Sequence, residues 1–374
     1  MVYLDNAATT ALDTRVLKEM LPYFTEVYGN PSAIHGMGRK AKLALEEARK
    51  KVAHLLDAKP AEVFFTSCGT ESTNTVLQAA VRELKCKHII TSPIEHHATL
   101  HTAEKLGEEF GVQVHFCKHQ SNGEIDYEDL KMLINKHASN SKIMVSIMHA
   151  NNEIGIINDI ERIGNIVKEN DAYFHSDMVQ TVGHLPISLS KLPIHFASAS
   201  AHKFHGPKGK GMLYICGSKK IAPLLLGGGQ ERNMRAGTED LAGIVGFAKA
   251  LELSLEDREM EHNHCVALKK YCWDQLAESV SAIKKSTDYE HTLARVLSVL
   301  LPHNPNTEML QMSLDIKGIA VSGGSACSSG ALGGSHVIKY IEKEACVPLR
   351  ISFSKWNTSE EIDKLVSALK ASLH

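Results

Sequence analysis

The chain has 374 residues, of which 43% are hydrophobic and 22% charged, and its formal net charge is −2. This length and composition are typical of a soluble globular protein with one large domain plus a smaller one, or with two domains. The near-zero charge excludes a global field that would attract nucleic acid or an anionic membrane. The sequence contains no run of 18 or more apolar residues, so no transmembrane helix is expected.

The cysteines and the N-terminus indicate where the protein functions. The eight cysteines are scattered and form no C-x-x-C pair, so a disulfide framework is not expected. The first ten residues, MVYLDNAATT, have no basic region followed by an apolar region, as a secretory signal would. We therefore expect a reducing, cytoplasmic location.

The first two-thirds of the chain predict an α/β domain. Residues 32–56, rich in Ala, Leu, Glu and Lys, predict a long helix. Short apolar runs then alternate with helical patterns, which predicts a mostly parallel sheet buried on both faces. The predicted strands are 62–66, 87–91, 112–117, 142–148, 172–176, 196–200 and 211–215, and the predicted helices between them are 71–84, 99–110, 127–136 and 160–170.

The last third predicts a smaller α+β unit. Residues 241 to about 283 form a long helical stretch that leads away from the first domain. After it, strands and helices mix without the regular alternation seen earlier. The predicted strands are 295–301, 319–322 and 349–353, and the predicted helices are 308–316 and 359–372.

Lys203 is the first candidate for chemistry. It stands in SASAHKFHGPKG (198–209), directly after a predicted strand of small residues, and the carboxyl ends of strands are where α/β sheets bind ligands. Asp177, in YFHSDMVQ, follows an earlier strand. A lysine that forms an imine and an aspartate that meets a pyridinium nitrogen are typical of pyridoxal phosphate enzymes. The alternative is an ordinary solvated loop lysine.

The segment TSCGTESTN (66–74) is a candidate phosphate site, because a predicted strand runs there into a helix. Gly69 and Thr70 would lie at the helix N-terminus, where free N–H groups and the helix dipole attract anions. Thr70 is also expected to cap the helix, with Glu71 in its first turn. The alternative is an ordinary capped helix with no ligand.

Ten motifs follow one another along nearly the whole chain. They are YLDNAATT (3–10), GNPSAIH (29–35), TSCGTES (66–72), EHHA (95–98), MHANNEIG (148–155), HSDMVQTVG (175–183), SAHKFHGPKGKGMLY (200–214), GGGQERNMRAGTED (227–240), SGGSACSSG (322–330) and LRIS (349–352). With these motifs in this order, the chain resembles the cysteine desulfurases of the NifS/IscS-like group, within the class-V aminotransferase family.

The resemblance implies a fold and a reaction. The fold is the pyridoxal phosphate-dependent transferase fold of type I, with a large, mostly parallel seven-stranded domain (12–255) and a smaller α+β domain (1–11 and 256–374). The reaction converts L-cysteine to L-alanine and leaves a persulfide on Cys327. The sulfur would supply iron–sulfur clusters, thio-cofactors or thiolated tRNA. A homodimer and a sulfur-acceptor or scaffold protein are the implied partners, without direct nucleic-acid or membrane binding.

The resemblance also assigns residues to the cofactor ring. Lys203 would hold pyridoxal phosphate as an imine, and Asp177 would pair with its pyridine nitrogen. His96 would stack on the ring and relay protons. Asn152 and Gln180 would contact the hydroxyl side of the ring.

A second set of residues is assigned to the phosphate, the substrate and the sulfur. Arg350 would bind the substrate carboxylate, which its planar guanidinium suits, and Asn152 would also touch this carboxylate. Cys327 would accept the sulfur. The residues implied to hold the phosphate are Gly69, Thr70, Ser200, His202 and, reaching over from the other protomer, Thr238 of the partner subunit.

Cys327 fits this role by its surroundings as well. Glycine, serine and alanine surround it in SGGSACSSG, so the segment offers little to pack and predicts a loop. A mobile loop suits a thiolate that attacks a substrate sulfur and carries a persulfide away. The alternative is a small buried hydrophobic side chain, the commonest state of a cysteine.

Alternative functions remain at this point. Selenocysteine cleavage or another class-V reaction would use the same cofactor, and a non-catalytic sulfur-transfer partner would keep only the fold. A metal-dependent hydrolase is a further alternative, because His96, His97 and His101 have helix-compatible ligand spacing and HNHC (262–265) is also suggestive. No acidic or cysteine ligand completes either pattern at a diagnostic spacing, so no metal is expected.

Overall fold

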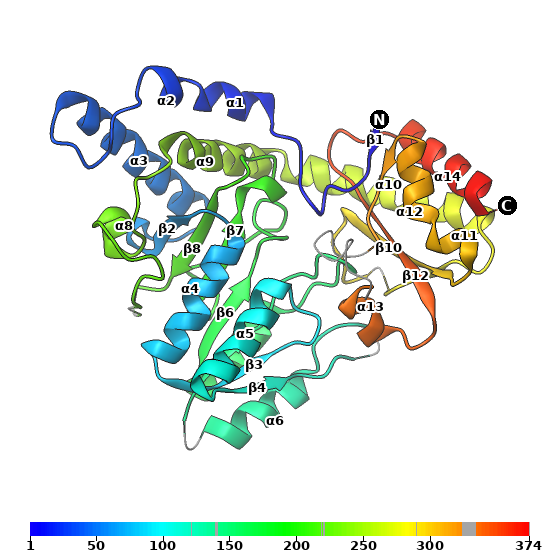
Figure 1. Ribbon diagram of the computed structural model, residues 1–374, viewed down its shortest axis with the longest axis horizontal. Helices are drawn as coiled ribbons and strands as arrows, with labels where there is room; N and C mark the ends of the chain where they lie inside the picture. The colour runs from blue at the N-terminus through cyan, green and yellow to red at the C-terminus, as the bar shows by residue number, and fades with distance from the viewer. Residues whose placement is uncertain are drawn as a thin grey trace.

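The structure is a computed structural model that describes residues 1–120, 122–138, 141–217, 219, 221–288, 290–323 and 334–373. A seven-stranded sheet with its helices, here called the large body, lies beside a smaller group of strands and helices, here called the small body (Figure 1). Cys327 lies outside the described residues.

The large sheet has the strand order β2-β8-β7-β6-β5-β3-β4. Every neighbouring pair is parallel except those of β8, which is antiparallel to both β2 and β7. The predicted mostly parallel, seven-stranded sheet is therefore confirmed. Its strands are β2 (Val63–Thr66), β3 (Cys86–Thr91), β4 (Gln113–Phe116), β5 (Lys142–Ser146), β6 (Tyr173–Asp177), β7 (Phe196–Ser200) and β8 (Gly211–Ile215).

Helices cover both faces of this sheet, which explains the continuous apolar runs of its strands. Successive side chains of a strand point to opposite faces, so Ile89 and Ile90 belong to two different core clusters. The helices of the Ile90 cluster are α1 (Thr14–Met20), α3 (Gly36–Leu55), α6 (Tyr127–Ala138), α7 (Ile160–Glu169) and α9 (Leu241–Glu256), and those of the Ile89 cluster are α4 (Gly69–Arg82) and α5 (His97–Phe110).

The small body has its own core. Its antiparallel sheet has the order β12-β10-β9, and β1 (Val2–Tyr3) pairs in parallel with β11 (Ile319–Ala320). The remaining strands and helices are β9 (Lys284–Lys285), β10 (Val296–Pro302), β12 (Cys346–Ser352), α10 (Arg258–Ser279), α11 (Pro305–Glu308), α12 (Leu310–Ile316), α13 (His336–Ile341) and α14 (Ser359–Leu373).

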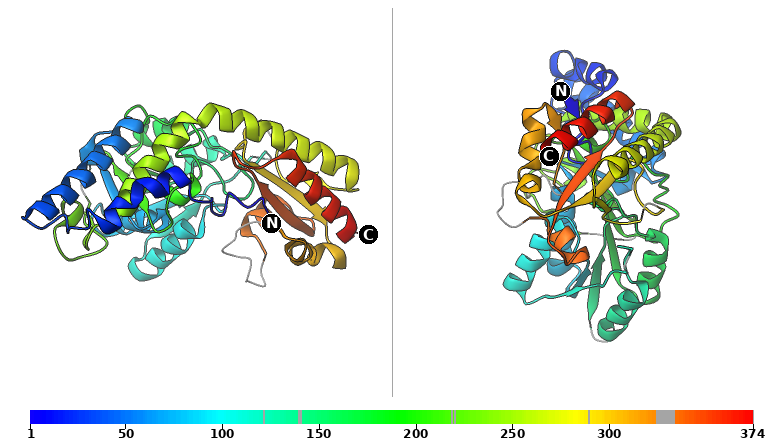
Figure 2. Two further views of the ribbon diagram at one scale, coloured as in Figure 1. Left: turned by 90° about the horizontal axis from the view of Figure 1, so that it is seen from above. Right: turned by 90° about the vertical axis from the view of Figure 1, so that its right-hand side faces the viewer.

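The N-terminus belongs to the small body and then crosses to the large one. Leu4 packs in the small-body core, and its carbonyl accepts a hydrogen bond from the backbone N–H of Ser352 at 2.7 Å. The chain continues along the junction to α1 and the short α2 (Pro22–Thr25) on the large body (Figures 1 and 2). The domain division 12–255 against 1–11 with 256–374 stays a prediction, which the separate core clusters support.

The helical stretch predicted from 241 to about 283 is two helices. Asp257 ends α9 and begins α10 with φ −85° and ψ −4°, and β9 takes residues 284–285. The Asp257 carboxylate accepts hydrogen bonds from Lys355 at 2.8 Å and from Arg15 at 3.3 Å. These contacts tie the break to both bodies, so α9 packs on the large body and α10 on the small one.

Across the described residues, none of the helices combines the length and apolarity that a membrane crossing needs. The described cysteines form no disulfide.

Candidate active site

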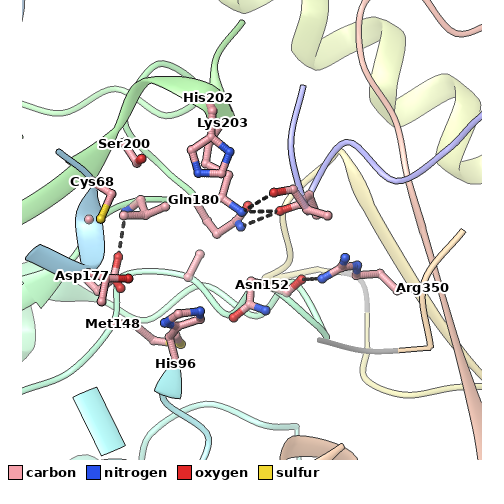
Figure 3. A pocket seen from close by; sticks show the side chains of 16 residues that line it. Cys68, His96, Met148, Asn152, Asp177, Gln180, Ser200, His202, Lys203 and Arg350 are labelled. Atoms are coloured by element: carbon pink, nitrogen blue, oxygen red, sulfur yellow. Dashed lines mark hydrogen bonds between the residues drawn. The ribbon is translucent and has the colours of Figure 1, made fainter. Parts of the chain in front are cut away.

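A cavity of about 220 Å³ lies at the junction of the two bodies, beyond the carboxyl ends of β6 and β7. Figure 3 shows it from close by. Strand ends of an α/β sheet are the usual place for a ligand crevice. Ten of the residues singled out from the sequence line this cavity: Gly69, Thr70, His96, Asn152, Asp177, Gln180, Ser200, His202, Lys203 and Arg350.

Lys203 is held from two sides at the end of a 3-10 turn (Ala201–Lys203) after β7. Its Nζ donates hydrogen bonds to the carbonyl oxygens of Ala7 at 2.7 Å and Ala8 at 2.8 Å. Its own carbonyl oxygen accepts from Arg295 Nη1 at 2.8 Å and lies 2.8 Å from His184 Nε2. Arg295 and His184 thus hold the backbone of Lys203, while its amine points into the cavity (Figure 3).

Asp177 is a buried carboxylate at the end of β6. Burial raises its pKa to about 6, although a hydrogen bond from the Val179 N–H at 2.9 Å and the positive charge of Lys203 act in the opposite direction. Desolvation disfavours the charged form of a carboxyl group, and a cation placed against it restores that form. The Asp177 site therefore suits a ligand that brings a positive charge.

His96 is neutral at physiological pH. It caps α5, and its Nδ1 accepts a hydrogen bond from the Ala98 N–H at 3.1 Å, which assigns the ring proton to Nε2. Burial, and after it the charge of Lys203, lowers the His96 pKa to about 4. An uncharged imidazole that faces the cavity can pack on an aromatic ring.

The segment around Gly69 forms a narrow cradle. Helix α4 begins at Gly69, and a Cβ atom placed on this residue would lie only 2.5 Å from Cγ2 of Val179. The N-cap is Cys68, which makes no side-chain capping bond, so the expectation that Thr70 caps this helix is wrong. Thr70 lies in the first turn instead. Without a side-chain cap, the first N–H groups of α4 are available to an anion.

Ser200 and His202 complete this end of the cavity. Ser200 is the buried last residue of β7, and His202 Nδ1 lies 3.1 Å from Thr9 Oγ1. Burial, together with the charge of Lys203, lowers the His202 pKa to about 3. In Figure 3 Ser200 and Cys68 lie at one end of the cavity and Arg350 at the other.

Arg350 comes from β12 of the small body. Its Nη1 donates to the Asn152 carbonyl at 2.7 Å, and its Nη2 donates to Asp5 Oδ1 at 2.7 Å. Its Nε is buried and has no hydrogen-bond partner within the described part of the chain. Gln180 leaves its Oε1 in the same state while its Nε2 donates to the Ala7 carbonyl at 3.1 Å. Such orphaned groups are rare in protein interiors and point to a polar ligand.

Thr238 does not line the cavity of its own chain. It is exposed in the segment between α8 (Gln230–Asn233) and α9. Cys327 lies outside the described residues, and Ser322 and Ser335 are described residues that precede and follow it in the sequence. Ser322 exchanges backbone hydrogen bonds with Arg350, and the Ser335 hydroxyl donates to the carboxylate of Glu153, next to Asn152.

The two histidine patterns weighed as metal sites do not assemble. His96 turns its Nδ1 to the cap of α5, and its ring centroid is 6.2 Å from that of His97. On α10, His262 is exposed and Cys265 is buried. Among the residues that the structure describes, three potential metal ligands come together at another place, considered below.

Comparison with known proteins places the chain in a family. The family model described as "Aminotransferase class-V" matches residues 2–365. The chain belongs to the class-V aminotransferase family. The resemblance inferred from the motifs is thereby confirmed.

The class-V relatives include proteins named "Cysteine desulfurase IscS". The one from Dictyoglomus turgidum is 41% identical over 99% of this chain and 93% of its own, and the one from Methanosarcina thermophila is 43% identical over 98% and 91%. The solved structure named "NIFS-LIKE PROTEIN" has a TM-score of 0.91 at 40% identity and covers 100% of this chain and 99% of its own. The structure named "SspA in complex with cysteine" has a TM-score of 0.82 at 30% identity and covers 96% and 100%. The type I fold predicted from this family is confirmed.

Some residues of this class-V site were missed from the sequence. The carbonyl groups of Ala7 and Ala8 hold Lys203, and only the motif YLDNAATT pointed to that segment. Arg295 and His184 hold the carbonyl of Lys203, and no local pattern signals them. Arg295 is 92 residues from Lys203 in the chain, so only the tertiary structure brings them together.

Proposed function

We propose that this protein is a pyridoxal phosphate-dependent cysteine desulfurase, which converts L-cysteine to L-alanine and passes the sulfur to Cys327. The observation that carries the proposal is a single cavity that combines a lysine amine, a buried carboxylate, a neutral imidazole and an arginine. The names of the class-V relatives, and the complex of the similar protein SspA with cysteine, support the same reaction.

The residues present fit pyridoxal phosphate. Lys203 would hold it covalently, Asp177 would face its ring nitrogen and His96 would cover its ring. The free N–H groups at the start of α4, with Ser200 and His202, would bind its phosphate. The unpartnered Gln180 Oε1 would accept a hydrogen bond from a polar group of the ring. When bound, this cofactor supplies an electron sink that stabilises negative charge on the substrate α-carbon.

The side chains have separate tasks around the substrate. Arg350 would bind the α-carboxylate, with Asp5 and the Asn152 carbonyl fixing the plane of its guanidinium. When the substrate amine takes the place of Lys203 on the cofactor, the freed Lys203 Nζ would accept a proton from the substrate α-carbon. The neutral His96 would donate or accept a proton at its Nε2 on the ring side of the cavity.

Cys327 is the proposed acceptor of the sulfur. Its thiolate would attack the substrate sulfur, so that an S–S bond forms while the C–S bond breaks. The carbon that is released takes up a proton and becomes the methyl group of alanine. Two described residues that flank Cys327 in the sequence support this role: Ser322 bonds to Arg350, which lines the cavity, and Ser335 bonds to Glu153, the neighbour of Asn152.

A homodimer in the cytoplasm belongs to the proposal. Thr238 is exposed in its own protomer, as expected if Thr238 of the partner subunit meets the phosphate. Nearby Leu226 has 84% of its surface exposed, which suits a protein contact. A reducing compartment keeps a reactive thiolate available. A sulfur-acceptor protein that serves iron–sulfur cluster, thio-cofactor or tRNA synthesis would remove the persulfide.

Alanine release from L-cysteine tests the proposal. In the presence of a reductant, the wild type should form alanine continuously, and the Cys327→Ala variant should form none while its cofactor absorbance is unchanged. Cys346→Ala, which removes a partly buried thiol away from the cavity, is the matched control and should retain activity.

Two other outcomes are decisive. If neither wild type nor variant forms alanine although both carry the cofactor, cysteine is not the substrate. If Cys327→Ala loses cysteine cleavage but keeps selenocysteine cleavage, the acceptor role of Cys327 stands and the substrate range is wider.

A further inference from the structure

Three histidines from distant parts of the sequence meet on one face of the large sheet. His88 lies on β3, His115 on the edge strand β4 and His137 in the last turn of α6. One ring nitrogen of each lies within 4.8 Å of a ring nitrogen of both others. Figure 1 shows β3, β4 and α6 together at the side of the large body. His88 is near the amino end of β3, whereas the cavity lies beyond the carboxyl ends of the strands.

Two of these imidazoles share a hydrogen bond that a bound metal ion would replace, with loss of the shared proton. His88 Nδ1 and His115 Nε2 are 3.0 Å apart. Two nitrogens bound to one tetrahedral ion at 2.0–2.1 Å would be about 3.3 Å apart. Imidazole rings rotate about a soft torsion, so a small adjustment of both side chains would reach that spacing.

Ser141 supplies a contact that metal-binding histidines commonly have. His88 Nε2 lies 3.2 Å from Ser141 Oγ. A ligating histidine usually donates the N–H of its second nitrogen to such a partner, which fixes the ring and leaves the other nitrogen for the metal. With Nε2 directed at Ser141, Nδ1 of His88 is the nitrogen that faces His115.

His137 provides the third nitrogen. Its Nε2 is buried and, within the described residues, has no hydrogen-bond partner. Its ring stacks on those of His88 and His115, with 4.3 Å between centroids in both pairs, so the rings must turn before their nitrogens can converge on one ion. The negative end of the α6 dipole lies here, which favours a cation.

We propose that His88, His115 and His137 bind one divalent transition-metal ion of the zinc, cobalt or nickel class, with the remaining coordination position open to water. Three imidazoles without a carboxylate prefer such ions to Mg²⁺ and Ca²⁺, which require oxygen ligands. The proposal is independent of the proposed desulfurase reaction, since none of these histidines lines the cavity.

Metal binding to the complete holoenzyme tests the site. Protein freed of metal by a chelator and kept in a phosphine reductant is dialysed against Zn²⁺ or Co²⁺, and the bound ion is counted by elemental analysis. Wild type should hold one ion per chain at this site. Ser141→Ala should weaken the affinity by about 10–100-fold, and His88→Gln or His137→Gln should weaken it further. His262→Gln, at an exposed histidine of the HNHC motif, should bind like wild type.

The Co²⁺ spectrum identifies the ligands. Nitrogen coordination at the three histidines should give d–d absorption without a thiolate charge-transfer band. Metal-free melting temperatures and cofactor absorbance of the variants should match wild type, which shows that the folded state is intact. The proposal is overturned if the His88→Gln/His137→Gln double variant binds as tightly as wild type, or if binding disappears in Cys327→Ala instead, which would assign the metal to the thiol.

Discussion

The large and small bodies differ in what they contribute to the cavity. Nine of the ten predicted residues that line it come from the large body, and Arg350 alone comes from the small one. The large body places its residues after the ends of parallel strands, where backbone groups are free to meet a ligand. The small body supplies Arg350 from β12, a buried side chain that lines the cavity. In the proposed reaction, the large body would hold the cofactor and the small body would hold the substrate carboxylate.

The two bodies also bury different titratable groups. The large body holds neutral imidazoles such as His175, whose pKa burial lowers to about 3. The small body holds Lys269, whose pKa burial lowers to about 7. Each body should therefore respond to pH in its own range, and the comparison can be tested by activity and by stability.

The largest expected effect is that of Lys203→Ala in the large body. In the proposed reaction, removal of the amine would remove both the covalent link to the cofactor and the proton transfer, so alanine formation should fall by about 10²–10⁴-fold. The imine absorbance should disappear as well. Lys208→Ala, an exposed lysine five residues later, is the control and should behave like wild type. Normal turnover in Lys203→Ala would remove the lysine from the mechanism.

Arg350→Lys tests the contribution of the small body. Lysine cannot make the paired contacts to Asp5 and the Asn152 carbonyl while also binding a carboxylate. Hydrogen bonds to charged groups contribute roughly 1.5–3 kcal/mol, so kcat/KM for L-cysteine should fall by about 10–100-fold. Cofactor affinity should not change, in contrast to Lys203→Ala. Arg162→Lys, on the exposed face of α7, is the control, and equal losses of cofactor and substrate binding in Arg350→Lys would contradict the division between the bodies.

Acid should destabilise the large body through its buried histidines. His175 contacts the Ser146 and Ser198 hydroxyls at 2.9 Å and is neutral when folded, whereas the unfolded chain protonates it below about pH 6.5. The unfolded state then binds more protons, so stability falls as the pH falls. Between pH 7 and pH 5 this group alone should remove roughly 2 kcal/mol. Urea unfolding at both pH values should show a smaller loss for His175→Gln, and an equal loss would refute the assignment.

Raising the pH above 7 should stabilise the small body through Lys269. Lys269 donates to Thr292 Oγ1 at 2.7 Å and to the Leu293 carbonyl at 3.0 Å, and its folded pKa lies far below the unfolded value. Above pH 7 the folded state loses this proton before the unfolded state does, so stability rises with pH. From pH 7 to pH 8 the wild type should gain about 1 kcal/mol relative to Lys269→Met. Lys270→Met, at the exposed neighbour, should follow the wild type, and parallel curves for all three proteins would count against the shift.

The sequence alone determined much of the fold and most of the site. Strands buried on both faces tend to be apolar throughout, which made central strands such as β5 and β8 recognisable. The edge strand β4 is not buried in this way and was recognised from its place in the alternation of strands and helices. The resemblance carried by the motifs named ten of the sixteen residues that line the cavity. A local expectation failed at Thr70, because α4 begins at Gly69, which makes Cys68 the N-cap and places Thr70 inside the first turn.

Only the tertiary structure decided the contacts between distant segments. At the break between α9 and α10, the Asp257 carboxylate accepts hydrogen bonds from Arg15, which precedes it in the sequence, and from Lys355, which follows it. The Lys203 carbonyl accepts a hydrogen bond from Arg295, which is distant in the sequence. The three-histidine group joins two strands and a helix, and the sequence spacing of these histidines does not indicate a metal site. Such contacts form only over a few ångströms. Residues that are far apart in the sequence come this close only when the chain folds, so the sequence pattern does not reveal which of them meet.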